Sequence, residues 1–476
     1  MEKDICFSSA RNLARAIKGR KLSVREVMEA HLTQIKRVNQ KVNAIVSLNE
    51  ELALKEAVKA DEMLEAGKQA GPFFGLPIAI KDTHHAVGFP ATSGSLALRD
   101  HYPSEDDLIV ERLREAGAIV IGKTNVPEFA AGAHTFNEVF GATRNPYDLS
   151  KTAGGSSGGA AAAVTCGMIP FADGSDMGGS LRYPACFNNV VGLRTSPGRI
   201  PLPKAALYSP LGVQGPIARS VDDAFFMMSV ISGPDNRSPL SIEEPGQKFL
   251  EPVQPDIKGL RIAYSADFGG ILPVEPEVRS NLVEQVKVFE ELGCHIEEAC
   301  PDLHEAEEVF QVLRAWEFEL SYSEIFNRFR ELIKPSVIWN IEKGRNLSGP
   351  DIGRAERLRT LLYNRMRSFF TQYDALILPV TQVTAFDVNL EYPTQINGVK
   401  MENYIDWMRS CYYISAAGNP SLSIPSGFTS GGTPLGLQIV GPHRADFEVL
   451  KIGRAFEQAT GYGKIRPEIA LGEKIN

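Results

Sequence analysis

The sequence is poor in cysteine and lacks the spacing of a metal or redox motif. The six cysteines of the 476-residue chain are Cys6, Cys166, Cys186, Cys294, Cys300 and Cys411. None belongs to a Cys-x-x-Cys pair, and a disulfide-stabilised secreted domain would be much richer in cysteine. No His-Glu-x-x-His or clustered metal-ligand pattern occurs either. We therefore expect reduced thiols, no metal site and a cytoplasmic location.

Long apolar runs are also missing. No stretch approaches the roughly 18 consecutive apolar residues of a membrane-spanning helix, and the N-terminus has no apolar signal core. An excess of positive charge is missing too, because 50 Lys and Arg residues stand against 58 Asp and Glu residues. Nucleic acids and anionic membranes select basic surfaces. We expect neither of them as a partner.

What the chain does have is an ordinary globular composition. Hydrophobic residues make up 43% and charged residues 23%, which is enough apolar material for a large core. Short apolar segments alternate with amphipathic helical segments, which is typical of an α/β layered structure. We expect one domain over residues 1–476, with a helical region at 1–70 and a helical insertion at 303–372 that shapes a substrate pocket.

One nucleotide-binding pattern is present by its letters. Residues 117–124, Gly-Ala-Ile-Val-Ile-Gly-Lys-Thr, fit the Walker A expression. In a phosphate-binding loop the residues between the glycines wrap the phosphate with their N–H groups. Here those residues are Ala-Ile-Val-Ile, which favour a strand. A nucleotide-binding protein is the alternative from another functional class, and we expect this segment to be a strand instead.

A run of glycines and serines is the strongest local signal. Residues 154–159 read Gly-Gly-Ser-Ser-Gly-Gly and lead into an alanine-rich segment. Consecutive glycines let the backbone approach a ligand closely. The alanines favour a helix beginning near Gly158, which places free N–H groups and the positive helix end beside the serines. The alternative is a flexible Gly-Ser loop, which rarely runs straight into a strong helix former.

A second glycine pair precedes Ser180 and follows the apolar segment CGMIPFA. A serine directly after glycines at the end of a strand is a candidate nucleophile. The backbone N–H groups that would form its oxyanion hole belong to Met177, Gly178, Gly179 and Ser180. The alternative is an ordinary Gly-Gly turn.

A serine nucleophile needs a base, and the sequence offers two kinds. His84, His85 and His134 are candidates for a Ser-His-Asp arrangement, but none has a recognisable flanking pattern. Lys81 ends the apolar run GLPIAIKD, and desolvation there would lower its pKa and let it accept a proton. The alternative for Lys81 is a strand-end lysine whose ammonium group reaches water.

Lys81-Asp82, the run at 154–159 and Asp-Met-Gly-Gly-Ser-Leu-Arg at 176–182 together resemble the amidase signature family of hydrolases. Further segments, among them VIGKTNVPEF and GNPSLSIPSGF, are also similar to that family, so the resemblance covers residues 8–460. It implies a central mixed β-sheet covered by α-helices on both faces. It also implies no cofactor.

The resemblance implies a triad of two serines and a lysine. Ser180 is similar to the family's nucleophile, Ser156 to the bridging serine that follows a cis peptide bond, and Lys81 to the base. The expected supporting residues are Ser157, Asp176 and Arg182.

Two departures from the family pattern concern the pocket. Met177 stands where the family commonly has threonine, and Gly-Leu-Lys-Pro-Thr is replaced by Gly-Leu-Arg-Thr-Ser at 192–196. An oxyanion hole needs only the N–H of Met177, so the departures bear on the shape of the acyl pocket and its hydrogen bonds.

The expected function is hydrolysis of a carboxylic amide C–N bond through a Ser180 acyl-enzyme. The alternative within the family is the amidase subunit of a tRNA-dependent amidotransferase, against which Met177 and the stretch TNVPEFAAGAH argue. The expected substrate is an apolar or aromatic small-molecule amide, with esters and carbamates as additions, and a homo-oligomer stays open. The aromatic residues expected to line its pocket are Trp316, Trp339, Tyr404 and Trp407. Their alternative role is core packing.

Overall fold

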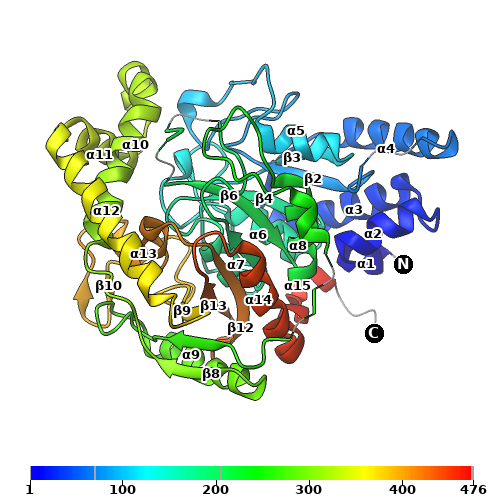
Figure 1. Ribbon diagram of the computed structural model, residues 1–476. Helices are drawn as coiled ribbons and strands as arrows, with labels where there is room; N and C mark the ends of the chain where they lie inside the picture. Colours follow the sequence, from blue (N-terminus) through cyan, green and yellow to red (C-terminus); the bar gives the residue numbers. More distant parts are fainter. Residues whose placement is uncertain are drawn as a thin grey trace.

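A mixed eight-stranded sheet runs through the centre of the computed structural model (Figure 1). The structure describes residues 2–68, 71–203, 206–208, 211–251, 253–254 and 256–472. In spatial order the strands are β4 (Phe171–Asp176), β6 (Val213–Ala218), β5 (Val191–Arg194), β12 (Ser421–Phe428), β13 (Pro434–Val440), β9 (Ala375–Pro379), β7 (Arg261–Tyr264) and β8 (His295–Glu298). The pairs from β4 to β9 are antiparallel, while β9–β7 and β7–β8 are parallel. The expected central mixed sheet is confirmed.

Helices cover both faces of this sheet, as expected. On one face lie α6 (Gly158–Thr165), α7 (Arg182–Phe187) and α13 (Arg409–Ala417), and on the other lie α8 (Val221–Ile231), α9 (Pro276–Glu291) and α14 (Asp446–Thr460). Gly436 of β13 lies against Cys186 of α7, whereas Gly453 of α14 lies against Leu422 of β12. Because successive strand residues point to opposite faces, these close approaches mark the two sides of the sheet.

A second, three-stranded sheet carries the candidate base. Its order is β1 (Ile45–Leu48), β3 (Ile119–Thr124) and β2 (Pro77–Lys81), and β2 lies beside β4 of the central sheet. β2 and β3 are the strands expected at the apolar runs. β1 corrects the expectation that residues 1–70 are helical. Helix α3 ends at Asn43, which has left-handed backbone, and the apolar run that follows pairs with β3.

The N-terminal helices lie beside this small sheet. They are α1 (Glu2–Phe7), α2 (Ala10–Lys18), α3 (Val24–Val42) and α4 (Glu50–Glu65), with α5 (Leu108–Glu115) beside them, and α4 packs against β3. A capping box of Ser23 and Glu26 opens α3. Residues 1, 69 and 70 of the expected helical region lie outside the described residues.

Three helices project on the opposite side of the molecule from the N-terminal helices (Figure 1). They are α10 (Ala306–Phe329), α11 (Pro335–Arg345) and α12 (Gly349–Phe369), which occupy the segment expected to be a helical insertion. We call these three helices the helical arm. α10 packs against α11, α12 and α13, so the arm is joined to the face of the central sheet.

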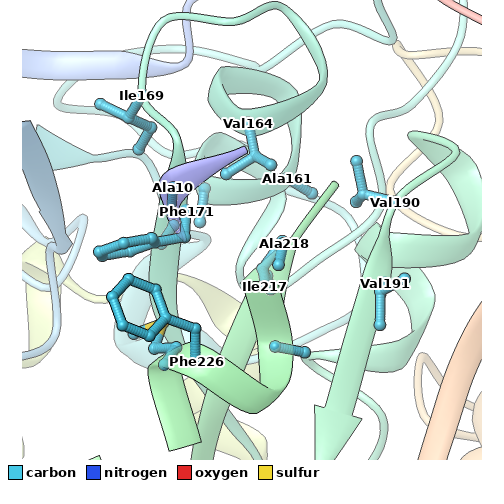
Figure 2. Close-up of a cluster of buried hydrophobic side chains, with 14 of the residues drawn as sticks. Ala10, Ala161, Val164, Ile169, Phe171, Val190, Val191, Ile217, Ala218 and Phe226 are labelled. Atoms are coloured by element: carbon cyan, nitrogen blue, oxygen red, sulfur yellow. The ribbon is translucent and has the colours of Figure 1, made fainter. Parts of the chain in front are cut away.

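The core is continuous between the two sheets. Figure 2 shows side chains of α6, α8 and the strands β4, β5 and β6 meeting in one buried cluster, which includes Phe171, Ile217 and Phe226. The alanine run of α6 is buried along its whole length, so small side chains let this helix approach the strands closely. The two short strands β10 (Gln395–Ile396) and β11 (Val399–Lys400) pair with each other, and α15 (Glu468–Leu471) lies near the C-terminal end of the described chain. Within the described ranges, no helix combines the length and apolarity needed to span a bilayer.

Candidate active site

Lys81 ends β2 with its side chain fully buried. Its Nζ lies 2.8 Å from Ser156 Oγ, 2.9 Å from Ser157 Oγ and 2.9 Å from Ser175 Oγ. The structure thus brings Lys81 together with Ser156 and Ser157 of the glycine–serine run. Ser175 was missed, although its place next to Asp176 in a strand was a usable signal. The amine is surrounded by three hydroxyl groups and is shielded from water.

The glycines around Ser156 explain how two serines reach one lysine. The peptide bond between Gly155 and Ser156 is cis, as the family resemblance implied, and Gly154 has a φ of +71°. A Cβ at Gly155 would lie 2.9 Å from the backbone nitrogen of His134, and one at Gly158 would lie 2.3 Å from Thr135 Oγ1. Only glycine fits at these positions. Helix α6 begins at Gly158, as expected.

Burial dominates the protonation of Lys81. It lowers the pKa of the amine to about 7, while the negative charges of Asp173 and Asp176 act in the opposite direction. Near neutral pH a large fraction of the side chain is therefore the uncharged amine, which has a lone pair available for a proton.

Ser180 lies just beyond the end of β4 and is partly exposed to the same cavity as Ser156. The carbonyl of Ser180 accepts the N–H of Ser157 at 3.2 Å, which ties the two serine segments together. The bridging role that the resemblance gives Ser156 leads us to expect a hydrogen bond between the hydroxyls of Ser156 and Ser180, and none is found among the described residues. The Ser156 hydroxyl contacts Lys81 Nζ, and Ser180 lines the cavity.

A buried ion cluster holds the turn that carries Ser180. The Asp176 carboxylate contacts Arg182 at 3.0 Å and Arg194 at 3.2 Å, and all three side chains are fully buried. Burial opposes ionisation of Asp176, but the two guanidinium groups hold the pKa of this carboxyl well below its usual range. Arg194 is one of the departures from the family pattern, and it binds Asp176 at the end of β4, close to Ser180 in the chain.

The backbone N–H groups at residues 177–180 are not equivalent. The N–H of Gly179 donates to Asp176 Oδ1 at 2.8 Å, so it is already used. For the N–H groups of Met177, Gly178 and Ser180, the described part of the chain supplies no hydrogen-bond acceptor. These three donors are available for an oxyanion, whereas Gly179 contributes by shaping the turn.

A cavity of about 220 Å³ opens at Ser156 and Ser180. Its polar lining includes His84, Gln214, Arg314 and Glu317. Its large apolar lining residues are Phe129, Met177, Phe310, Phe318, Tyr322 and Met408. The helical arm supplies one wall, because residues from Phe310 to Tyr322 belong to α10.

The four aromatic residues expected to line the pocket do not do so in the described structure. Trp407 is 1% exposed and packs against Tyr183 and Phe386, and Trp339 packs edge-on against the buried Tyr404. Trp316 packs against the buried hydrophobic cluster that contains Trp407 and Tyr404. Core packing, the alternative role, is what these residues show.

The histidine candidates separate into different environments. His134 is buried between Thr152 and the carbonyl of Val388, and burial lowers its pKa to about 4. His85 donates its backbone N–H to Asp107. His84 lines the cavity and pairs with Asp173, so it is a cavity residue that the flanking sequence did not reveal.

The segment that fits the Walker A expression does not form a phosphate-binding loop. Residues 119–124 form β3 and are buried at every position, so their N–H groups cannot wrap a phosphate. The described ranges contain no group of three or more His, Cys, Asp or Glu residues placed to hold a metal ion.

The chain is similar to known proteins along nearly its whole length. The Amidase family model matches residues 26–450. An acylamidase of Rhodococcus erythropolis is 34% identical over 99% of this chain and 99% of its own length. A glutamyl-tRNA(Gln) amidotransferase subunit of Geobacillus kaustophilus (strain HTA426) is 34% identical over 96% of this chain and 98% of its own. The crystal structure of a bacterial aryl acylamidase of the amidase signature family superposes with a TM-score of 0.91, at 29% identity, over 98% of this chain and 99% of that one.

Proposed function

We propose, since this chain belongs to the amidase signature family and hydrolyses carboxylic amide C–N bonds, that Ser180 is its acylated nucleophile, with Ser156 as the bridge and Lys81 as the base. The observation that supports this most strongly is the contact of the buried Lys81 amine with the Ser156 hydroxyl at 2.8 Å.

The three hydroxyls around Lys81 can satisfy an uncharged amine as well as an ammonium group, which would donate to all three. An amine has two N–H donors and one lone pair, and three hydroxyls lie within 2.9 Å of Nζ. Two hydroxyls can accept from the amine while the third donates to it. We assign the donating hydroxyl to Ser156, because it lines the cavity together with Ser180, whereas Ser157 and Ser175 hold the amine in place.

The reaction then proceeds as a proton relay. Substrate binding turns the Ser180 hydroxyl toward Ser156; Ser156 passes its proton to Lys81 and takes the proton of Ser180 as Oγ attacks the amide carbonyl. The N–H groups of Met177, Gly178 and Ser180 stabilise the oxyanion. The relay runs in reverse to protonate the leaving amine, and water hydrolyses the acyl-enzyme.

The substrate proposed is a small-molecule amide with an apolar or aromatic arm, with esters and carbamates as further candidates. Phe129, Phe310 and Phe318 give the cavity apolar walls that suit such an arm. The named activities of the acylamidase and aryl acylamidase relatives support the same class.

A second candidate is the amidase subunit of a tRNA-dependent amidotransferase. It is favoured by the 34% identity, over 96% of the chain, to one component of the glutamyl-tRNA(Gln) amidotransferase. The chain purified alone separates the two, because the first candidate hydrolyses aryl amides without partner subunits. Glutamine hydrolysis that requires the other components of the complex would favour the second.

We also propose that the chain works in the cytoplasm as one domain. The site takes Lys81 from the small sheet, Ser180 from the end of β4 and a wall from α10, so no single segment contains it. Cys166, Cys186, Cys294, Cys300 and Cys411 are free thiols, which fits a reducing compartment.

The nucleophile is tested by Ser180→Ala. Amide turnover should fall by about a thousandfold or more, and labelling by a fluorophosphonate should be lost, while the melting temperature stays close to that of the wild type. Ser157→Ala is the matched control, because Ser157 also contacts Lys81 but should keep the label. Labelling of the Ser180→Ala protein at the wild-type rate would place the nucleophile elsewhere.

A further inference from the structure

A chain of hydrogen bonds runs from the catalytic strand to the wall of the substrate cavity. Asp173 of β4 accepts the backbone N–H of Lys81 through Oδ1 at 3.0 Å and contacts His84 Nδ1 through Oδ2 at 2.5 Å. His84 Nε2 lies 3.4 Å from Nε2 of Gln214 on β6. Gln214 stands directly opposite Ser175 in the β4–β6 ladder, so the two side chains share the face that looks toward Lys81.

The Gln214 amide is placed with its NH₂ toward His84. An NH₂ group only donates, so His84 Nε2 is the acceptor and Nδ1 carries the proton shared with Asp173. Gln214 Oε1 therefore points away from His84. Gln214 is only 2% exposed, and its Oε1 has no hydrogen-bond partner among the described residues.

Glu317 of α10 brings a second acceptor to the same wall. Its Oε1 accepts the N–H of Leu211 at 3.1 Å, and Leu211 precedes Gln214 by three residues in the chain. The side chains of Glu317 and Gln214 both line the cavity. No donor to Glu317 Oε2 is found in the described ranges. Burial raises the pKa of Glu317 to about 7, with Arg359 and Arg314 acting in the opposite direction.

We propose that Gln214 Oε1 and Glu317 form an acceptor subsite for a neutral hydroxyl or N–H group that the substrate carries in addition to its reacting amide. The inference rests on the proposed function and narrows its substrate class to amides whose apolar or aromatic arm bears a hydrogen-bond donor.

Charge and desolvation select the kind of donor. A buried acceptor left without a partner costs free energy, so an arm made only of carbon leaves Gln214 Oε1 unpaired whereas a hydroxyl satisfies it. Burial opposes the ionisation of Glu317 and Arg314 lines the same cavity, so a neutral donor fits this wall without adding a further charge to be desolvated.

Binding of matched amides to the Ser180→Ala protein tests the proposal without turnover. The probes are phenylacetanilide and its four monohydroxylated derivatives, which are isomers of one another with the hydroxyl at the 3- or 4-position of either ring. The dissociation constant of each probe is measured by calorimetry. At least one isomer should bind about tenfold more tightly than phenylacetanilide. Gln214→Met in the same background should reduce that ratio to below about twofold. If Gln214→Met does not fold, Glu317→Met provides the same comparison.

The matched control is Gln285→Met. Gln285 is also buried with an unpartnered Oε1, but it lies on α9, away from the cavity, and bonds Tyr462. This variant should keep the tenfold ratio. The proposal is overturned if all isomers bind within about twofold of phenylacetanilide, if no probe binds, or if Gln285→Met lowers the ratio as much as Gln214→Met. Turnover of phenylacetanilide by the wild-type protein is a separate readout, so a failure of the proposed amidase chemistry is distinguishable.

Discussion

The residues around Lys81 and the helical arm contribute to one cavity but are built differently. Lys81, Ser156 and Ser175 come from a buried layer of strand ends and glycine turns, where a Cβ at Gly155 would meet backbone at 2.9 Å. The arm contributes one face of α10, and its outer surface carries exposed ion pairs such as Arg354–Glu308. Backbone geometry and buried charges therefore fix the catalytic residues. The substrate instead contacts side chains of α10, which can be substituted with less effect on the fold.

The largest expected effect comes from breaking the buried charge beside Ser180. Asp176→Asn leaves Arg182 and Arg194 without their carboxylate inside the protein. The free energy of unfolding should fall by about 3–5 kcal/mol, because an uncompensated buried charge is expensive. Denaturant unfolding followed by circular dichroism measures it.

The arm supplies the control for that experiment. Glu308→Gln removes the partner of Arg354, whose side chain is 61% exposed, and should change the free energy of unfolding by less than about 1 kcal/mol. Equal losses for the two variants would erase the distinction between the two regions.

A smaller effect is expected at the hydroxyl that the sequence did not reveal. Ser175→Ala removes one of the three hydroxyls around Lys81 Nζ, so the amine is held less firmly against Ser156. We expect kcat/KM to fall about tenfold to a hundredfold. The acid limb of the pH profile should move to lower pH, because the ammonium form loses a hydrogen-bond partner.

Ser321→Ala is the matched variant in the arm. Ser321 lines the cavity from α10 and makes no contact with Lys81 in the described structure. Its kcat/KM should stay within about twofold of the wild type and its acid limb should not move. A shift of the limb in Ser321→Ala, or none in Ser175→Ala, would contradict the role given to Ser175.

The smallest effect is expected from the arm's aromatic wall. Phe318→Leu keeps an apolar side chain under the Arg314 guanidinium but removes a ring from the cavity. KM for an aromatic amide should rise about threefold to tenfold, while kcat stays within about twofold, because the lost contact serves binding rather than the reacting atoms. Trp407→Phe, a change in the core away from the cavity, should leave KM unaltered. A KM change for Trp407→Phe that exceeds the change for Phe318→Leu would indicate that Trp407 contacts the substrate.

The same contrast explains what the sequence predicted. The Lys81 strand, the helix after the glycine run and the α/β layering follow from local patterns, namely a short apolar run, an alanine tract and strand–helix alternation. The mixed central sheet was implied by the resemblance to the amidase signature family. Glycines flank the serines in the sequence, because the backbone there approaches neighbouring segments too closely for a side chain. These signals lie in consecutive residues, so they can be read without knowing the tertiary structure.

The lining of the cavity depends on which helix face meets the sheet. Phe310, Arg314, Glu317 and Phe318 recur at helical spacing on one face of α10, and Trp316 points elsewhere by the rotation of the helix. Aromatic content alone therefore selected the wrong residues. Ser175 and Gln214 were missed, and the sequence named His84 without its partner Asp173, for a related reason. These contacts depend on the register of β4 with β6 and on β2 lying beside β4.

The central claim, that the uncharged amine of Lys81 is the base, is tested most directly by the pH dependence of kcat/KM for an aryl amide. Because the pKa of Lys81 is lowered to about 7, kcat/KM should be small where the amine is protonated, rise through a midpoint near pH 7, and stay level above it. The same midpoint should appear in His84→Gln, and Lys81→Met should lose activity at every pH. A limb that disappears in His84→Gln, while Lys81→Met retains turnover, would contradict the lysine assignment and make the histidine beside Asp173 the base.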